Sequence, residues 1–191
     1  ALELFGVLAS ENDYVSRDYH FNKVKTFHHM MDERTQEEPR AWDLEGATHR
    51  AGFKIEELVE FVRAASPSEE DFGQALSQLH QALDKAADKV AKKTPAQQDL
   101  IGQVDALIDT LYFTYGSFVL MGVDPERIFD IVHQANMGKI FPDGKAHFDP
   151  VTHKILKPDD WEEKYAPEPA IKKELQRQLK AYERHKERNK Q

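Results

Sequence analysis

Two groups of carboxylates at helical spacing are the residues of this sequence best suited to chemistry. Glu56, Glu57 and Glu60 lie within five consecutive positions, and Asp105 and Asp109 are the two charged residues of a long, otherwise apolar segment. Side chains three or four positions apart share one face of a helix. If the two helices pack face to face, the carboxylates share one small volume. Oxygen ligands select hard cations, so the pattern indicates Mg²⁺, with Mn²⁺ as the alternative ion.

Each group also has a simpler explanation. Two like charges on an apolar helix cannot both stay ionised in a low dielectric unless one takes a proton, a basic side chain pairs with them, or a metal ion lies between them. The glutamates, taken alone, fit the solvated face of an ordinary amphipathic helix. Phe53 and Phe61 fall on or beside that acidic face, which indicates that the face is covered. This pattern favours a metal site between the two helices.

Basic and amide side chains near these groups are candidates for binding substrate phosphates, because Mg²⁺ is usually completed by water and phosphate oxygens. Arg50 and Lys54 precede the glutamates on the same predicted helix. Lys139 and Lys145 lie in the turn after a later predicted helix. Asn136 ends that helix and can donate a hydrogen bond to a phosphate oxygen.

A di-iron centre is not favoured. Carboxylate centres of that type in helical bundles use the motif Glu-x-x-His twice. The nearest match here, Asp130-x-x-His133, occurs once. We interpret His28, His29 and His49 as ordinary helix residues rather than ligands.

Apolar residues recur at helical period along most of the chain, which predicts an all-α fold. Helices are expected over residues 13–33, 43–65, 68–93, 94–121 and 124–137, with a last helix from residue 169. A Pro-Asp-Gly turn signal predicts a loop or small hairpin over 139–158. We expect a helical bundle with a four-helix core in a domain over 1–168, and a charged C-terminal helix appended over 169–191.

Composition excludes several classes of function. The chain has 191 residues and a formal net charge of −8, and it contains no Cys. The absence of Cys excludes a disulfide framework, thiolate chemistry and metals bound by cysteine sulfur. An acidic body does not attract nucleic acid. Two aspartates argue against a membrane span over 100–121, so we predict that this segment is a buried core helix. We expect a cytoplasmic protein. Residues 172–191 carry eight basic residues and three Glu, a net charge of +5, and form either a solvated docked helix or a partner-binding arm.

Three stretches resemble a known group of enzymes. The sequence IEELVE contains Glu56-Glu57-x-x-Glu60, a later stretch reads DALIDTLYFTYG, and a third runs from VDPERIFDIVHQANMGKIFPDGK to KILKP. Together they resemble the all-α nucleoside triphosphate pyrophosphohydrolases, which include the MazG-like proteins, the dimeric dUTPases and the phosphoribosyl-ATP pyrophosphohydrolases. The resemblance covers about residues 50–157.

The resemblance implies roles for particular residues. Glu57, Glu60 and Asp109 would be Mg²⁺ ligands, and the segment Asn136-x-x-Lys139 would lie near substrate phosphates. The usual second motif of these enzymes, Glu-x-x-Asp, would put Glu at position 106. This chain has Ala106 there and an Asp one residue earlier, a shift of about 100° around the helix.

Asp105 therefore binds the metal directly, through water, or not at all. With Glu56 it is a candidate for the fourth ligand or for the base that activates water, and Glu56, Glu57 and Asp105 are the catalytic candidates. The implied reaction is the Mg²⁺-dependent hydrolysis of a nucleoside or deoxynucleoside triphosphate to monophosphate and pyrophosphate, in nucleotide-pool house-cleaning by a homodimer or homotetramer. The alternatives are a phosphoribosyl-ATP substrate and a non-catalytic helical scaffold with a basic, partner-binding tail.

Overall fold

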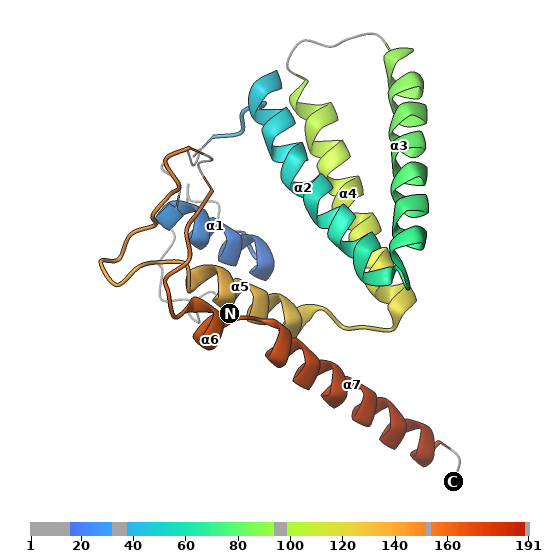
Figure 1. The fold of residues 1–191 in the computed structure, drawn as a ribbon, viewed down its shortest axis with the longest axis vertical. Coiled ribbons are helices and arrows are strands. Elements are labelled where there is room, and N and C mark those ends of the chain that lie inside the picture. The colour runs from blue at the N-terminus through green and yellow to red at the C-terminus, as the bar shows by residue number, and fades with distance from the viewer. Residues whose placement is uncertain (1–15, 32–37, 94–98, 152–153, 190–191) are drawn as a thin grey trace. The chain divides into compact units, whose positions relative to one another are not determined.

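Helices make up most of the part of the chain that the structure describes. A computed structural model describes residues 16–31, 38–93, 99–151 and 154–189. The helices in chain order are α1 (Tyr19–Met31), α2 (Leu44–Ala65), α3 (Glu69–Ala91), α4 (Leu100–Met121), α5 (Glu126–Met137), α6 (Trp161–Tyr165) and α7 (Glu168–Arg188), shown in Figure 1. The predicted all-α class is confirmed. The sequence patterns do not predict the short helix α6.

Side-chain caps fix where several helices begin. Asp43 Oδ1 accepts a hydrogen bond from the Gly46 backbone N–H at 2.7 Å, at the start of α2. Ser68 Oγ accepts one from the Asp71 N–H at 3.1 Å, at the start of α3. Each bond satisfies a first-turn donor that lacks a partner within its helix. The predicted helix ends at 13–15, 32–33 and 94–95 lie outside the described residues.

Contacts divide the chain into two compact units. The central unit comprises residues 38–112, and the terminal unit comprises residues 1–37 and 113–191. Helix α7 belongs to the terminal unit. A separate domain over 169–191 stays a prediction, as does the four-helix core.

The central unit is built on α2 and α3, which pack as an antiparallel pair (Figure 1). The Gln103 amide of α4 holds the backbone before α2: its Oε1 accepts from the Trp42 N–H at 2.8 Å, and its Nε2 donates to the Trp42 carbonyl at 3.0 Å. A Cβ on Gly46 would lie 2.5 Å from Cε3 of the Trp42 indole. Only glycine therefore lets this ring lie against the first turn of α2.

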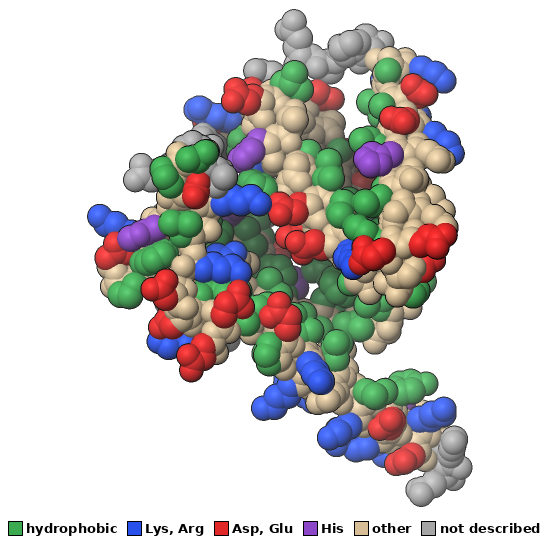
Figure 2. All heavy atoms as spheres, in the orientation of Figure 1, with side chains coloured by type: hydrophobic (Ala, Val, Ile, Leu, Met, Phe, Trp, Pro, Cys, Tyr) green, Lys and Arg blue, Asp and Glu red, His purple; other side chains and the backbone are tan. Residues whose placement is uncertain are grey.

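Apolar side chains of the central unit remain accessible. No described residue of this unit is buried, and the exposed fractions of Ile101, Val104 and Ile108 are 82%, 50% and 57%. The prediction that segment 100–121 is a buried core helix is therefore wrong for the single chain, because no residue of α4 is buried. Figure 2 shows apolar side chains lying among charged ones at the surface. No described helix combines the length and the apolar composition that crossing a membrane requires.

In the terminal unit, α5 packs against both α1 and α7. Polar bonds join α1 to the other helices: the Tyr19 hydroxyl donates to Asp130 Oδ2 at 3.0 Å, and Lys23 Nζ lies 3.3 Å from Asp130 Oδ1. His20 Nδ1 and the Tyr115 hydroxyl share a hydrogen bond of 2.8 Å. The two contacts to Asp130 hold α1 on α5, and the bond to Tyr115 joins α1 to the C-terminal half of α4.

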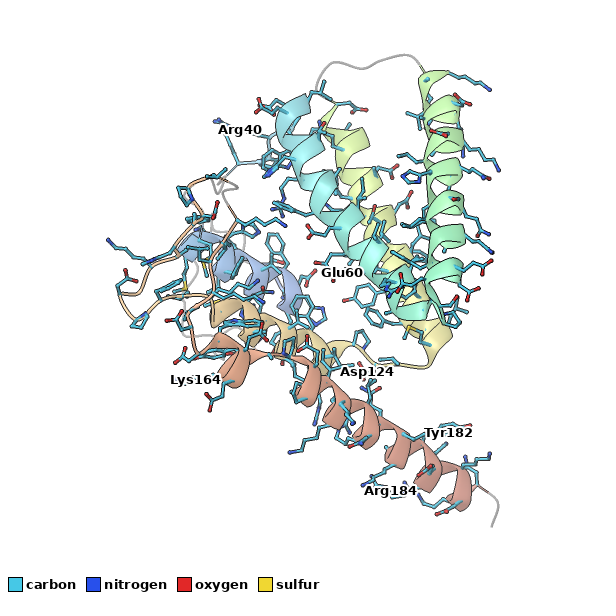
Figure 3. The ribbon with its side chains drawn as sticks, in the orientation of Figure 1. Arg40, Glu60, Asp124, Lys164, Tyr182 and Arg184 are labelled. Atoms are coloured by element: carbon cyan, nitrogen blue, oxygen red, sulfur yellow. The ribbon has the colours of Figure 1, made fainter. Side chains whose placement is uncertain are left out.

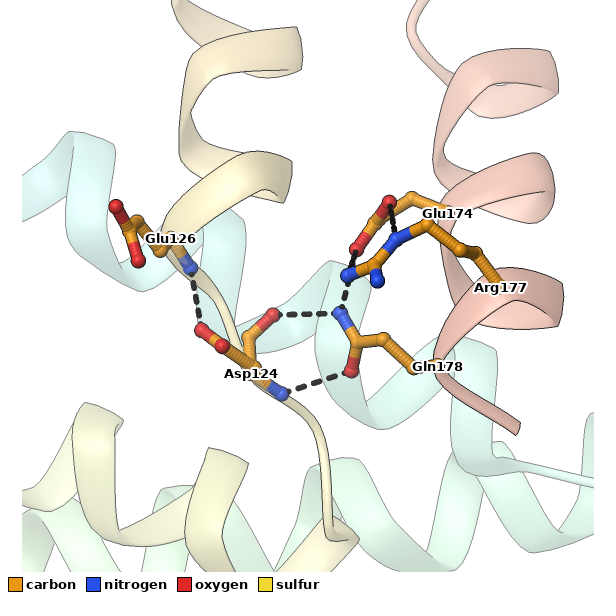
Figure 4. Close-up of polar contacts among 5 residues, drawn as sticks. All are labelled: Asp124, Glu126, Glu174, Arg177 and Gln178. Atoms are coloured by element: carbon orange, nitrogen blue, oxygen red, sulfur yellow. Dashed lines mark hydrogen bonds and ion pairs between the residues drawn. The ribbon is translucent and has the colours of Figure 1, made fainter. Parts of the chain in front are cut away.

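The first half of α7 is fixed to the segment before α5 by a polar cluster (Figure 4). The Gln178 amide accepts from the Asp124 N–H and donates to the Asp124 carbonyl, both at 2.9 Å. Gln178 also donates to Glu174 at 3.0 Å, and Arg177 donates twice to the same carboxylate, at 2.6 and 2.7 Å. Farther along, Tyr182 is 63% exposed on the outer half of α7 (Figure 3).

The segment 139–158 contains a small hairpin, as its turn signals predict. Phe148 and Ile155 pair as an antiparallel bridge, and the Leu156 N–H donates to the His147 carbonyl at 2.8 Å. Gly144 in the preceding turn has φ +77°, a conformation that glycine adopts without steric cost.

Replacing Glu174 by Gln tests the polar cluster on α7 that holds Gln178 against Asp124. Hydrogen bonds from Arg177, then from Gln178, lower the pKa of Glu174 from its ordinary value of 4.5 to about 2. The ionised carboxylate therefore stabilises the folded state above about pH 4.5, and this contribution is lost as the pH falls towards 2. We expect Glu174→Gln to lower the Tm by several degrees at pH 7, and the difference from wild type to disappear towards pH 2 in thermal melts.

The matched control is Glu183→Gln, on the exposed outer half of the same helix. It should leave the Tm unchanged across the same pH range. A difference for Glu174→Gln that stayed constant down to pH 2 would contradict the assignment of the stabilisation to the charged carboxylate.

Candidate active site

The predicted glutamates lie exposed along one stretch of α2, on which Figure 3 labels Glu60. Within the described chain, Glu57 and Glu60 form no hydrogen bond and no ion pair. Their spacing of three residues places them on one helix face. Both carboxylates are therefore available to a ligand from outside the described chain.

Asp105 and Asp109 occupy successive turns of α4 and are also exposed. Neither carboxylate forms an ion pair or a hydrogen bond with a described residue. The explanation that a basic side chain neutralises this pair is thus not supported by the described chain. Because both carboxylates are exposed in the single chain, water solvates them, and they need a counter-charge only where another chain covers them.

The structure brings each acidic pair together on its own helix but does not gather the pairs into one centre. Across the residues that it describes, no group of three or more His, Asp and Glu side chains is arranged to hold a metal ion. A metal site formed by all four carboxylates of α2 and α4 therefore stays a prediction.

Arg50 and Lys54 lie half-buried one turn apart on α2. Lys54 Nζ donates to the Arg50 carbonyl at 3.1 Å, and the Arg50 guanidinium lies 5.5 Å from the centre of the Phe53 ring. Burial, and then the charge of Arg50, lower the pKa of Lys54. Neither basic group forms an ion pair with a described carboxylate. An anion placed beside them would stabilise both charges.

Asn136 and Lys139 form a bonded pair at the end of α5, in the terminal unit. Lys139 Nζ donates to Asn136 Oδ1 at 2.8 Å, and both residues are half-buried. The Asn136 amide oxygen accepts from the lysine, so the amide N–H groups point away from the ammonium group. They can donate hydrogen bonds to another group. Lys145 is exposed in the next turn, and its side chain is not joined to this pair by any bond among the described residues.

Helix α6 contacts the same end of α5, and sequence reasoning missed it. The buried Trp161 indole donates through Nε1 to the Ala135 carbonyl at 2.8 Å. The Tyr165 ring lies directly against the buried Gly138. The segment is short and shows no helical period, so its aromatic residues were the one available signal.

Comparison with known proteins identifies the family. The family model of phosphoribosyl-ATP pyrophosphohydrolase matches residues 24–136, more than half of the chain. The chain belongs to the phosphoribosyl-ATP pyrophosphohydrolase family. The match includes both acidic motifs and ends at Asn136. The resemblance noted in the sequence is confirmed.

A solved structure is similar over most of this pyrophosphohydrolase. It is the crystal structure of a protein from Exiguobacterium sp. 255-15, provisionally named an NTP pyrophosphohydrolase. The two proteins are 38% identical with a TM-score of 0.79, over 87% of this chain and 99% of that chain. No curated protein matches the sequence significantly. Family and neighbour together show a hydrolase that acts on pyrophosphate bonds.

Proposed function

We propose that this pyrophosphohydrolase hydrolyses a nucleoside or deoxynucleoside triphosphate to monophosphate and pyrophosphate with the help of Mg²⁺, in nucleotide-pool house-cleaning. The observation that carries the proposal is the set of four accessible carboxylates on α2 and α4 that no described basic group neutralises. The neighbour from Exiguobacterium, whose provisional name specifies NTP, supports this substrate class.

The chemistry of the donor set suits Mg²⁺. Glu57, Glu60, Asp105 and Asp109 offer carboxylate oxygens alone, and Mg²⁺ is usually bound in proteins by one or two carboxylates plus waters and substrate phosphates. Two pairs of carboxylates are therefore enough to bind Mg²⁺, because water and substrate phosphates supply its other ligands. When bound, the ion lowers the pKa of a water and offsets the charge of the phosphates.

In the reaction, water adds its oxygen to one of the two phosphorus atoms that flank the α,β-bridging oxygen. The bond from that phosphorus to the bridging oxygen breaks, and the bridging oxygen leaves with the other product. Glu56 or Asp105 accepts the proton of the attacking water as general base. Products are the monophosphate, pyrophosphate and one proton, which balances the reaction.

The basic groups act on the phosphates. Arg50 and Lys54 offset phosphate charge. Burial and the charge of Arg50 lower the pKa of Lys54, and a phosphate beside it would stabilise its charged form. The Asn136–Lys139 pair offers an ammonium group and amide N–H donors to phosphate oxygens. Lys145 is a weaker candidate because no bond within the described chain holds its side chain in place.

A second copy of the chain is the partner that best explains the accessible face of α4. The exposed fractions of Leu107, Leu111 and Tyr112 are 46%, 47% and 75%, although a helix that is apolar all round is normally buried. Most soluble oligomers are symmetric, and in a twofold dimer the same apolar patch covers itself. We propose a homodimer, or a homotetramer built from it, in which α4 lies in the interface.

A phosphoribosyl-ATP substrate is the second candidate, because the matched family model bears that name. An assay of pyrophosphate release over the common ribo- and deoxyribonucleoside triphosphates, dUTP and phosphoribosyl-ATP separates the two. We expect release from one or more triphosphates with Mg²⁺ present and none when Mg²⁺ is removed by a chelator. Release from phosphoribosyl-ATP alone would replace the proposed substrate class. Silence over the whole panel would also overturn that class and would point to a substrate that the panel lacks.

Within that assay, Glu60→Gln and Asp109→Asn should each lower kcat/KM at least about a hundredfold, which corresponds to ~2.7 kcal/mol of transition-state stabilisation. Each change removes an oxygen charge without changing the size of the side chain. The control Asp88→Asn removes an exposed carboxylate from α3 and should leave kcat/KM unchanged. An Asp109→Asn enzyme that stays active and still requires Mg²⁺ would overturn the assignment of Asp109.

Mg²⁺ should raise the Tm of the wild-type protein, because a ligand that binds the native state alone stabilises it by about 2.7 kcal/mol at 100 times its Kd. The double variant Glu57→Gln/Glu60→Gln should lose this shift in differential scanning calorimetry. The matched control Asp84→Asn/Asp88→Asn removes a carboxylate pair at helical spacing from α3 and should keep the shift. Equal shifts in both variants would show that Mg²⁺ binds elsewhere.

Disrupting the α4 face should change the assembly state. Light scattering of the wild type should give a multiple of the chain mass of 22.0 kDa. Ile108→Glu/Leu111→Glu should shift the mass towards that of one chain, because a buried unpaired charge is costly in an interface. The control Val90→Glu alters an exposed apolar residue of α3 and should keep the wild-type mass. A monomeric wild type would contradict the proposed interface.

A further inference from the structure

Helix α6 contacts the end of α5 at Ala135 and Gly138, each of which is adjacent in sequence to a member of the proposed phosphate-binding pair. Asn136 and Lys139 are separated by two positions, and Gly138 is one of them. Gly138 is buried, and its backbone N–H donates to the Gln134 carbonyl at 2.9 Å as the last bond of the helix. The Lys139 N–H then donates to the Asn136 carbonyl at 3.0 Å. The pair is thus held on one tight turn.

The ring of Tyr165 occupies the space where Gly138 would otherwise carry a side chain. A Cβ built on Gly138 would lie 2.4 Å from Tyr165 Cγ, and 2.6 and 2.7 Å from the two Cδ atoms. Because Cγ and both Cδ atoms are involved, the clash is relieved only if the whole ring leaves its place, by rotation about the Cα–Cβ bond of Tyr165 or by a shift of α6. Gly138 has φ −64°, a value open to every residue, so close approach of the ring is the reason that the position suits glycine.

A second bond fixes α6 in this place. The indole of Trp161, 6% exposed, donates to the Ala135 carbonyl at 2.8 Å. That carbonyl belongs to the last turn of α5, where helix carbonyls lack partners within the helix. Lys157 Nζ lies 3.9 Å from the centre of the indole ring and covers its face. The α6 helix is therefore attached to α5 on both sides of Asn136.

We infer that α6 is a positioning element for substrate phosphates: Trp161 and Tyr165 hold the turn that orients the Asn136–Lys139 pair. This inference rests on the proposed function, which assigns phosphate binding to that pair. Trp161 and Tyr165 act through the turn and do not touch the reacting atoms. Trp161 and Tyr165 both lie beyond the residues that the family model matches. The proposed positioning element is therefore outside the shared family region.

The test is a double-mutant cycle between Gly138 and Tyr165. Gly138→Ala should raise KM for the triphosphate and lower kcat/KM about tenfold or more, since a displacement of about 1 Å at a positioning group costs up to ~10²-fold. Tyr165→Ala removes the ring atoms that the new methyl group meets. The double variant Gly138→Ala/Tyr165→Ala should therefore recover activity relative to Gly138→Ala. Gly73→Ala on α3, where a Cβ meets nothing within 4 Å, is the matched control and should behave as wild type.

A binding readout separates this inference from the proposed function. Calorimetric titration with inorganic triphosphate measures phosphate binding without turnover, and Lys139→Ala reports whether the pair takes part. Binding that does not depend on Lys139 would overturn the proposed role of the pair. Binding that depends on Lys139 but is unchanged by Gly138→Ala would overturn the role of α6 alone.

Two further outcomes decide the positioning role. If the double variant stays as impaired as Gly138→Ala, the clash with Tyr165 is not the cause and the inference is wrong. If Gly138→Ala does not fold, as judged by its circular dichroism, Trp161→Phe replaces it. That variant keeps an aromatic ring and removes the bond to Ala135, so it should raise the Kd for inorganic triphosphate several-fold, and an unchanged Kd would overturn the inference.

Discussion

An apolar helix that carries two aspartates sets the main constraint on this protein. A helix with the composition of α4 is normally buried, yet burial would place Asp105 and Asp109 close together in a low dielectric, where both cannot remain charged without help. The single chain avoids the conflict because α4 stays accessible. In the proposed assembly, a second chain that covers α4 would also bury the two aspartates, and these would then need a bound cation. Assembly and metal binding would then stabilise each other.

Two glutamine side chains attach helices to distant backbone in the same way. Gln103 pairs with both backbone groups of Trp42, and Gln178 pairs with both backbone groups of Asp124. A side-chain amide carries the same donor and acceptor as a peptide group. It can therefore satisfy backbone groups just before a helix, which have no partner within that helix. The first contact fixes the start of α2, and the second fixes the chain that enters α5. Both therefore lie upstream of proposed site residues.

The proposed metal ligands lie in the shared family region, and the contacts that hold α5 come from the rest of the chain. The matched residues 24–136 contain the acidic motifs and the basic pair of α2. Helices α6 and α7 follow this region, but each attaches to α5: α6 at its end and α7 just before its start. The Gln178 amide, which pairs with both backbone groups of Asp124, and the buried Trp161 indole make these attachments. If the Asn136–Lys139 pair binds phosphate as proposed, the segment beyond the family region positions that pair at the end of α5.

The sequence by itself determined every described helix except α6, and most of their described ends, because helical period, caps and proline act within a few residues of the chain. It also determined the acidic pairs, since spacing along one helix needs no tertiary contact. Only the tertiary structure decided that the single chain leaves α4 accessible and that the carboxylate pairs lack basic partners among the described residues. It likewise decided that α6 fixes the turn at Gly138. These features depend on contacts between segments that lie far apart in sequence, and local patterns carry no record of which segment will cover which face.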